Sequence, residues 1–229
     1  MPKALFAATL PSWSEAEILL REAFQGMAAG VVARALTSIN PAFCIQRVEG
    51  PCLTPTPFMN PEYTEKDVFT TNHDYAGEPM VLRPETTAST YAAIRAMNPK
   101  LPFCAWQVGK SFRRELNDGA SAARLRFNEF WQQEFQAVYR ADTKADYRGA
   151  VIDALLPEIA RFTRCKTRVV ESDRLPSYAL STLDIEVELP DGKWREIASC
   201  SIRADYGEGL LVSETAIGLC RVAAIGGAG

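Results

Sequence analysis

Histidine is almost absent from this sequence of 229 residues, because His73 is the only one. Histidine is the side chain most often used for acid–base work near neutral pH, so triad chemistry and histidine-rich metal centres have almost no material here. The six cysteines form no C-x-x-C pair, which argues against a zinc knuckle. Their placement in apolar stretches favours reduced thiols and a cytoplasmic protein.

Long apolar runs and an excess of positive charge are also lacking. We expect no membrane span, because no run of 18 apolar residues is present, and no signal peptide follows the first residues. The net charge of −3 and the pI of about 5.4 give no overall basic field of the kind that nucleic-acid binding favours. With 47% hydrophobic and 23% charged residues and no visible boundary, the chain is predicted to form one domain over residues 1–229.

The pattern along the chain predicts many strands and few helices. Strands are expected near 43–48, 80–83, 103–115, 125–135, 167–171, 182–189, 194–201 and 209–214, with turns at Asn117-Asp118-Gly119 and Asp191-Gly192. Helices are expected from a capping box at Ser14 to about Thr37, from Pro84 to Met97, from a cap at Asp142 to about Arg164 with a bend at Pro157, and from Ala216 to about Ile225. Since βαβ alternation and phosphate-binding glycine loops are missing, the predicted class is α+β, a mainly antiparallel β-sheet flanked by helices.

One predicted hairpin carries the main candidate chemistry. Arg113 and Glu115 are two residues apart on its first strand and therefore share a face, as do Arg126, Phe130 and Glu134 on its second strand. Arginines suit a planar, paired grip on phosphate, and an aromatic ring can stack on a base. On spacing alone, a solvated hairpin with weak surface ion pairs remains the alternative.

The strand QVGKSFRRE and the returning pattern R-x-x-x-F-x-x-x-E resemble motif 2 of the class II aminoacyl-tRNA synthetases, most closely the glycyl enzymes. The resemblance implies that Arg113 grips the α-phosphate of ATP and that Phe130 stacks on adenine. It also places Arg126 on the terminal phosphates and Glu115 on the adenine or the tRNA end. Asn128 stands where the family often has a second arginine.

Two further segments support the same resemblance. LRPETTA is similar to a loop of the glycyl enzymes, which implies that Glu85 holds the α-ammonium group of the substrate. A favourable carboxylate at a helix N-terminus is the alternative for that residue. WREIASCSIR is similar to both glycyl and seryl patterns, which implies that Glu196 and Ser199 bind Mg²⁺ and that Arg203 faces the amino-acid carboxylate. A buried strand with one paired charge is the alternative there.

The segment ETAIGLCR resembles motif 3, a strand that leads into a helix whose arginine grips the γ-phosphate. That role falls on Arg221, and Glu214 matches an acidic residue that contacts the amino acid in the glycyl enzymes. Ala216 stands where those enzymes have a serine, which leaves the identity of the amino acid open. The helix from Ser14, the strand after it and Pro51 resemble motif 1, which implies a homodimer.

The resemblance covers about residues 14–225 and implies a ligase with ATP and Mg²⁺ as cofactors. It would activate a small amino acid, first of all glycine, to an aminoacyl-adenylate and transfer it to tRNA or a tRNA-like acceptor. The family's anticodon-binding domain is not expected in this sequence, so tRNA is one acceptor among several.

Two other functions stay open. The adenylate could be passed to a carrier protein, a protein lysine or a modified nucleotide. The fold could also serve as a non-catalytic binding module, as in the DNA polymerase accessory subunit related to glycyl-tRNA synthetase. The presence of Arg113, Glu115, Phe130, Glu196 and Arg221 argues against the module, which has no need of them.

Overall fold

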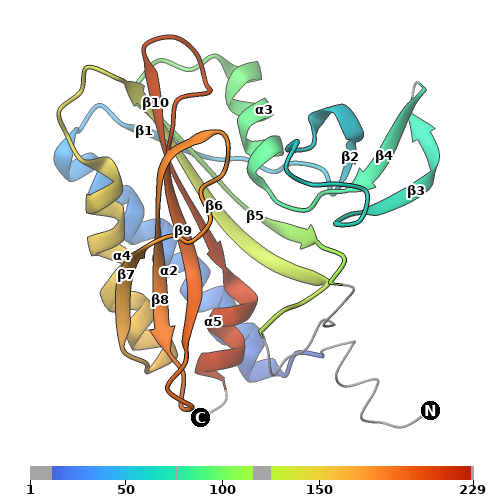
Figure 1. The fold of residues 1–229 in the computed structure, drawn as a ribbon. Coiled ribbons are helices and arrows are strands. Elements are labelled where there is room, and N and C mark those ends of the chain that lie inside the picture. Colours follow the sequence, from blue (N-terminus) through green and yellow to red (C-terminus); the bar gives the residue numbers. More distant parts are fainter. Residues whose placement is uncertain (1–11, 76, 116–124, 228–229) are drawn as a thin grey trace, which may run out of the picture.

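A seven-stranded sheet forms the centre of the computed structural model, which describes residues 12–75, 77–115 and 125–227 (Figure 1). In spatial order the strands are β1 (Cys44–Arg47), β5 (Phe103–Phe112), β6 (Glu129–Arg140), β10 (Leu210–Gly218), β9 (Trp194–Arg203), β8 (Ala179–Glu188) and β7 (Thr167–Glu171). Every neighbouring pair is antiparallel except β1 and β5. The predicted α+β class with a mainly antiparallel sheet is therefore confirmed.

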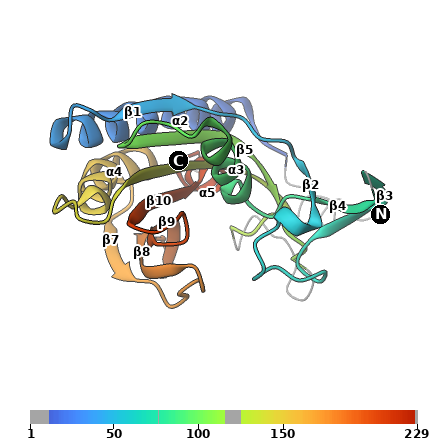
Figure 2. The ribbon, with the colours of Figure 1, turned by 90° about the horizontal axis from the view of Figure 1, so that it is seen from above.

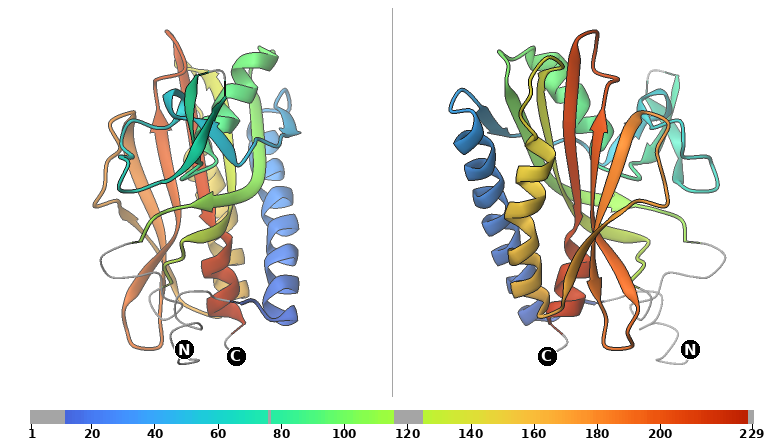
Figure 3. Two further views of the ribbon diagram at one scale, coloured as in Figure 1. Left: turned by 90° about the vertical axis from the view of Figure 1, so that its right-hand side faces the viewer. Right: turned by 60° about the vertical axis from the view of Figure 1, so that its left-hand side comes forward.

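Three helices cover one face of this sheet: α2 (Glu15–Ile39), α4 (Tyr147–Thr163) and α5 (Leu219–Gly226). The right-hand view of Figure 3 shows α2 and α4 running side by side along the sheet. Buried residues of α2 recur every four positions, at Phe24, Ala28, Val32 and Leu36, so one stripe of the helix faces the core. No helix in the described ranges is long and apolar enough to span a lipid bilayer.

The N-terminal ends of two helices can be compared with the caps predicted from the sequence. The capping box of α2 is confirmed, because the Ser14 hydroxyl accepts from Glu17 N–H while the Glu17 carboxylate accepts from Ser14 N–H. The predicted cap of α4 at Asp142 is wrong. Asp146 caps this helix instead, since its carboxylate lies 2.8 Å from the amide of Gly149.

The boundary between the last strand and the last helix lies further along the chain than predicted. The ladder between β10 and β6 continues as far as Gly218, so Ala216 lies on the strand and α5 begins at Leu219. The predicted turn at Asn117-Asp118-Gly119 lies outside the described residues.

A smaller unit stands on the other side of the large sheet (Figures 1 and 2). It contains a three-stranded sheet of β2 (Leu53–Pro55), β4 (Glu78–Leu82) and β3 (Phe69–Tyr75), the short helix η1 (Thr56–Phe58) and the helix α3 (Thr87–Met97). The sequence did not predict β2 or β3, because proline-rich and polar stretches resemble loops. The amide of Phe112 donates to the Arg83 carbonyl at 2.9 Å, which joins the end of β5 to the end of β4.

The two faces of the large sheet differ in polarity. The helix-covered face contributes apolar side chains to the main core, including Phe135 and Ile217. The opposite face carries buried polar residues in the middle of neighbouring strands, namely Gln107, Ser111, Gln132, Glu134, Gln136 and Glu214. Buried polar groups are costly unless they have partners, so this face is where a polar ligand site is expected.

Candidate active site

Arginines from three separate segments gather at one end of the polar face. Arg113 follows β5, Arg126 precedes β6, and Arg221 lies in the first turn of α5. Burial lowers the pKa of Arg221, and the positive charges of Arg113, Arg195 and Arg126 lower it further against the opposing effect of Glu196. The arginines are thus close enough to repel one another, and a polyphosphate between them would relieve that repulsion.

Backbone carbonyls hold two of these arginines in place. Arg113 donates from Nε to the Pro84 carbonyl at 3.0 Å, and Arg221 donates from Nε to the Leu125 carbonyl at 3.1 Å. Arg221 also donates from Nη1 to the Glu196 carbonyl at 2.8 Å. These bonds fix the guanidinium groups, and among the residues that the structure describes they leave further N–H groups of both arginines available to a ligand.

An aromatic pair flanks Arg113. Its guanidinium carbon lies 5.3 Å from the ring centre of Phe130 and 5.3 Å from that of Tyr63. Burial acts to lower the pKa of Arg113, but nearby Tyr63 and Glu85 outweigh it, so the pKa is raised. The predicted pair Arg113 and Phe130 is therefore brought together by the structure.

The predicted hairpin residues Glu115 and Arg126 also meet, as an ion pair of 3.0 Å. Asn128 connects the two strands, because its carbonyl accepts from Arg113 N–H at 2.9 Å and its side-chain oxygen accepts from Glu115 N–H at 3.0 Å. The Arg126 side chain is 54% exposed, and an exposed ion pair adds only about 0.2–1 kcal/mol. Both side chains can therefore reorient towards a ligand at little cost.

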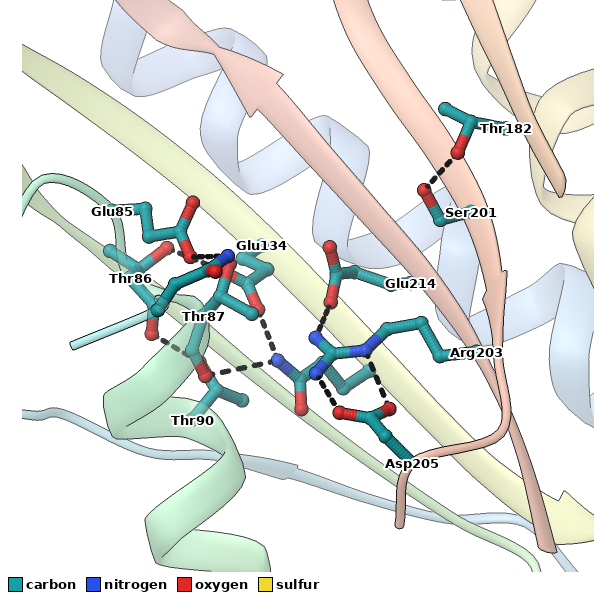
Figure 4. A network of polar contacts seen from close by, with 12 residues as sticks. Glu85, Thr86, Thr87, Thr90, Glu134, Thr182, Ser201, Arg203, Asp205 and Glu214 are labelled. Carbon is teal, nitrogen blue, oxygen red and sulfur yellow. Dashed lines mark hydrogen bonds and ion pairs between the residues drawn. The ribbon is translucent and has the colours of Figure 1, made fainter. Parts of the chain in front are cut away.

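Three buried carboxylates form a second cluster next to the arginines: Glu85, Glu134 and Glu214 (Figure 4). Glu85 accepts from Tyr63 Oη at 2.9 Å and from Asn60 Nδ2 at 3.2 Å. These partners, rather than the first amides of α3, hold Glu85, which disfavours the helix-terminus alternative. The predicted residues Glu85 and Glu214 are thus brought to one place.

Glu134 lies at the centre of this cluster. Its carboxylate accepts from the hydroxyls of Thr86 at 2.6 Å and Thr87 at 3.1 Å, and from the amide of Gln136. Thr86 is the N-cap residue of α3 but makes no side-chain cap, because its hydroxyl is directed at Glu134. Burial raises the pKa of Glu134 to about 8, and the nearby charge of Glu214 adds to the effect.

An excess of negative charge marks this pocket. The buried Arg203 lies beside the cluster, and it pairs with Glu214 and with Asp205, the latter at 2.6 Å. Burial raises the pKa of Glu214 despite that pairing. The cluster is therefore suited to bind one more cation, such as the ammonium group of an amino acid.

Arg203, which the resemblance places opposite the amino-acid carboxylate, is held by acidic and aromatic neighbours. Its Nε donates to Asp205 at 3.0 Å, and the ring of Tyr178 stacks on the guanidinium at 4.2 Å. The contact of Arg203 with a substrate carboxylate stays a prediction. It would use the N–H groups of the guanidinium that do not already bond these partners.

The two residues predicted to hold Mg²⁺ lie on β9 with different surroundings. The Glu196 side chain is 46% exposed and lies 3.4 Å from Arg221, whereas Ser199 is half-buried beside Asp184. Among the described residues, no three His, Cys, Asp or Glu side chains gather to hold a metal ion. An open carboxylate beside the arginines still fits Mg²⁺, which keeps water and substrate phosphates as ligands and seldom needs a full protein cage.

A cavity of about 410 Å³ opens beside Glu85 and Arg203. The side chains around it come from the end of η1 and the segment after it, from Glu85 and the first half of α3, from the loop before β8, and from the end of β9 and the residues after it. They are Phe58, Met59, Asn60, Pro61, Glu85, Thr87, Ala88, Tyr91, Ser177, Tyr178, Arg203 and Asp205. Sequence reasoning missed Tyr63, Tyr178 and Asp205 as site residues, since they lie in loops without a periodic pattern. The sequence placed Glu134 on the same strand face as Phe130 but gave it no role in the site.

Comparison with known proteins gives a consistent result. Residues 55–205 match the family model described as the tRNA synthetases class II core domain (F). Two similar proteins are the glycine–tRNA ligases of Mycoplasmopsis synoviae, 32% identical over 133 residues, and of Mycoplasma capricolum, 34% identical over 134 residues. Each match covers 55% of this chain and 29% of the relative, so the chain matches less than a third of those enzymes.

Solved structures with the same fold include two prolyl-tRNA synthetases. The enzyme from Giardia lamblia, solved with prolyl-adenylate, has a TM-score of 0.71 at 15% identity. The enzyme from Cryptosporidium parvum, solved with halofuginone and AMPPNP, has a TM-score of 0.66 at 14% identity. Each alignment covers 90% of this chain and 45% of the other.

Proposed function

Because the chain belongs to the class II tRNA synthetases, we propose that it uses ATP to activate a small amino acid as an aminoacyl-adenylate. One observation carries the proposal: the arginine cluster and the carboxylate cluster lie on the same sheet face and are joined through Arg113. The Nε of Arg113 donates a hydrogen bond to the carbonyl of Pro84, the residue before Glu85. A site with phosphate-binding groups at one end and ammonium-binding groups at the other matches the two substrates of this reaction.

The nucleotide would lie along the arginine cluster. Phe130 would stack on the adenine, Arg113 would bind the α-phosphate, and Arg126 and Arg221 would bind the terminal phosphates. Glu115 would contact the adenine or the acceptor end. Two prolyl-tRNA synthetases with this fold were solved with prolyl-adenylate and with AMPPNP, which supports the proposal that this chain binds a nucleotide.

The amino acid would bind in the carboxylate cluster. Glu85 and Glu214 would share its ammonium group, while Glu134 beside them, whose pKa burial raises to about 8, would stay protonated. Arg203 would orient the amino-acid carboxylate while it stays paired with Glu214 and Asp205. This places the carboxylate between the ammonium site and Arg113.

In the reaction, a carboxylate oxygen of the amino acid attacks the α-phosphorus of ATP. A new bond forms between that oxygen and phosphorus, and the bond to the leaving pyrophosphate breaks. No proton moves, so the chain needs no general base, and catalysis comes from positioning and from neutralising the charge that develops on the phosphates. Glu196 and Ser199 would hold Mg²⁺, which when bound supplies further neutralisation of the phosphates.

The acceptor is proposed to be tRNA or a tRNA-like molecule, as the names of the glycine–tRNA ligase relatives suggest. The same names make glycine the reference amino acid. A carrier protein, a protein lysine or a modified nucleotide is the alternative acceptor, and labelled amino acid incubated with ATP and each acceptor would separate them.

Amino-acid-dependent exchange of pyrophosphate into ATP tests the activation step itself. We expect exchange with at least one small amino acid. No exchange with any of the standard amino acids, together with no binding of ATP, would contradict the proposal and favour the non-catalytic module.

A further inference from the structure

We propose that the amino acid taken by this site carries an uncharged side chain and that the cavity beside Glu85 holds it. The inference rests on the proposed adenylate chemistry and names the substrate class. It departs from the glycine reference that the relatives provide, and it comes from the shape and charge of the pocket.

The size of the cavity is the first argument. At about 410 Å³ it has room for roughly a dozen water molecules at about 30 Å³ each. A site selective for glycine has to reject larger amino acids by contact at the α-carbon, whereas an open cavity there cannot do so. A side chain that covers the apolar wall also gains binding free energy, about 25 cal/mol for each Å² of apolar surface removed from water.

The walls of the cavity supply the second argument. Ala88 and Tyr91 are three residues apart on α3 and so share a face, and both line the cavity together with Phe58, Met59 and Pro61. Ala88 is the smallest side chain of this wall, and its short methyl group leaves the space open. The wall is thus mainly apolar next to the carboxylate that anchors the ammonium group, which fits an amino-acid side chain.

Charge selects against ionised side chains. The carboxylates of Glu85, Glu214 and Asp205 face two cations, because Arg203 pairs with Glu214 and Asp205 and Arg113 lies near Glu85. Burial keeps the pKa of Glu134 high, so Glu134 adds no charge to this balance. One ammonium group therefore balances the pocket. An acidic side chain would be repelled by the same carboxylates, and a basic one would bring a second positive charge without a carboxylate to spare.

Contacts between two loops hold the side of the cavity that carries Tyr178. Glu62 accepts from the backbone amide of Ser177 and lies 3.3 Å from Arg174, so the loop that carries Tyr178 is tied to the segment that carries Asn60 and Pro61. Tyr178 is in turn stacked on Arg203 at 4.2 Å. The cavity is therefore a formed pocket bounded by bonded loops.

Binding of non-reactive aminoacyl-sulfamoyl-adenosine analogues, measured by calorimetry, tests the inference without requiring turnover. The series comprises glycyl, alanyl, seryl, prolyl, valyl, methionyl, lysyl and glutamyl analogues. We expect at least one analogue with an uncharged side chain to bind tenfold or more tightly than the glycyl analogue. Tightest binding by the glycyl analogue, or by a charged one, would overturn the inference and leave adenylate formation intact.

A pair of variants on the same helix assigns the effect to the cavity. Ala88→Leu should weaken the tightest analogue tenfold or more and leave the glycyl analogue within threefold. Ala92→Leu, at an exposed position of α3, is the matched control and should change neither. Equal effects of Ala88→Leu on both analogues would contradict the assignment, and failure of every analogue to bind would contradict the proposed function as well.

Discussion

Arg113 donates a hydrogen bond from its Nε to the carbonyl oxygen of Pro84, 3.0 Å away. Pro84 precedes Glu85, so one bond links the group proposed to bind the α-phosphate to the loop proposed to bind the ammonium group. The attacking carboxylate and the α-phosphorus must meet between them. Fixing both ends of the site on one rigid sheet face is what the proposed reaction needs from the protein.

Replacement of Arg113 tests this link. Arg113→Ala should lower kcat/KM in pyrophosphate exchange by about 10²–10³-fold, because a positioned donor to the developing charge is lost. Arg114→Ala is the matched control, since the Arg114 side chain bonds the Glu65 carbonyl at 3.1 Å on the surface. Comparable losses for the two variants would contradict the role of Arg113.

Arg221 is expected to act on ATP and not on the amino acid. Arg221→Lys should raise the KM for ATP about tenfold, because a single point charge replaces a planar donor group, and should leave the KM for the amino acid within about twofold. Lysine is preferred to alanine here, since Arg221 also donates to the backbone of Leu125 and Glu196. An unchanged KM for ATP would show that the motif 3 assignment is wrong.

Glu134 should make the protein less stable as the pH rises. Its pKa is about 8 in the folded protein against 4.5 for the free group, so the folded state keeps a proton that the unfolded state has released. The free energy of unfolding should therefore fall between about pH 4.5 and pH 8. In Glu134→Gln that fall should be smaller, as measured by urea unfolding at pH 5, 6.5 and 8.

The control for this experiment is Glu129→Gln, an exposed carboxylate at the start of the same strand. Its stability should change with pH as in the unmodified protein. Identical pH dependence in the Glu134→Gln variant and the unmodified protein would contradict the assignment of the raised pKa to Glu134.

The buried pair of Arg203 and Glu214 should be important for stability. Glu214→Gln removes one of the two carboxylates that pair with Arg203 in the described part of the chain, and it should lower the free energy of unfolding by about 3 kcal/mol. Glu188→Gln breaks the exposed pair with Lys166 and should cost less than about 1 kcal/mol. Urea unfolding at pH 7 measures both, and equal losses would count against a buried, energetically coupled pair.

A direct measurement of the mass in solution tests the predicted homodimer. The motif 1 resemblance covers α2 and Pro51, and β1 beside them forms one edge of the large sheet. Light scattering at micromolar concentration should give twice the chain mass of 25.3 kDa. A mass of one chain under those conditions would contradict the dimer.

The sequence predicted correctly those features that depend only on residues close together in the chain. The capping box at Ser14 and the hairpin turn at Asp191-Gly192 form as expected, because each is built within a few residues. The alternation around Phe130 and Glu134 placed the polar face of β6 correctly. Asp142 failed as a cap because Asp146 competes for the same helix start and reaches its amides.

Features that depend on distant segments could not be predicted. The parallel pairing of β1 with β5 and the order of the strands follow from packing of the whole sheet. Two partners of Glu134, Thr86 and Thr87, lie almost fifty positions earlier at the start of α3, and the pairing of Arg203 with Glu214 joins neighbouring strands. Neither Tyr63 nor Tyr178 carries a periodic signal, so only the structure places them at the site.

The most direct test of the central claim follows the carboxylate oxygen. The protein is incubated with ATP, hydroxylamine and the best amino acid labelled with ¹⁸O in its carboxylate, and the products are analysed by mass spectrometry. Attack on the α-phosphorus predicts AMP carrying one labelled oxygen, together with the amino-acid hydroxamate and unlabelled pyrophosphate. Unlabelled AMP, label in inorganic phosphate, or no hydroxamate at all would contradict amino-acid activation by this chain.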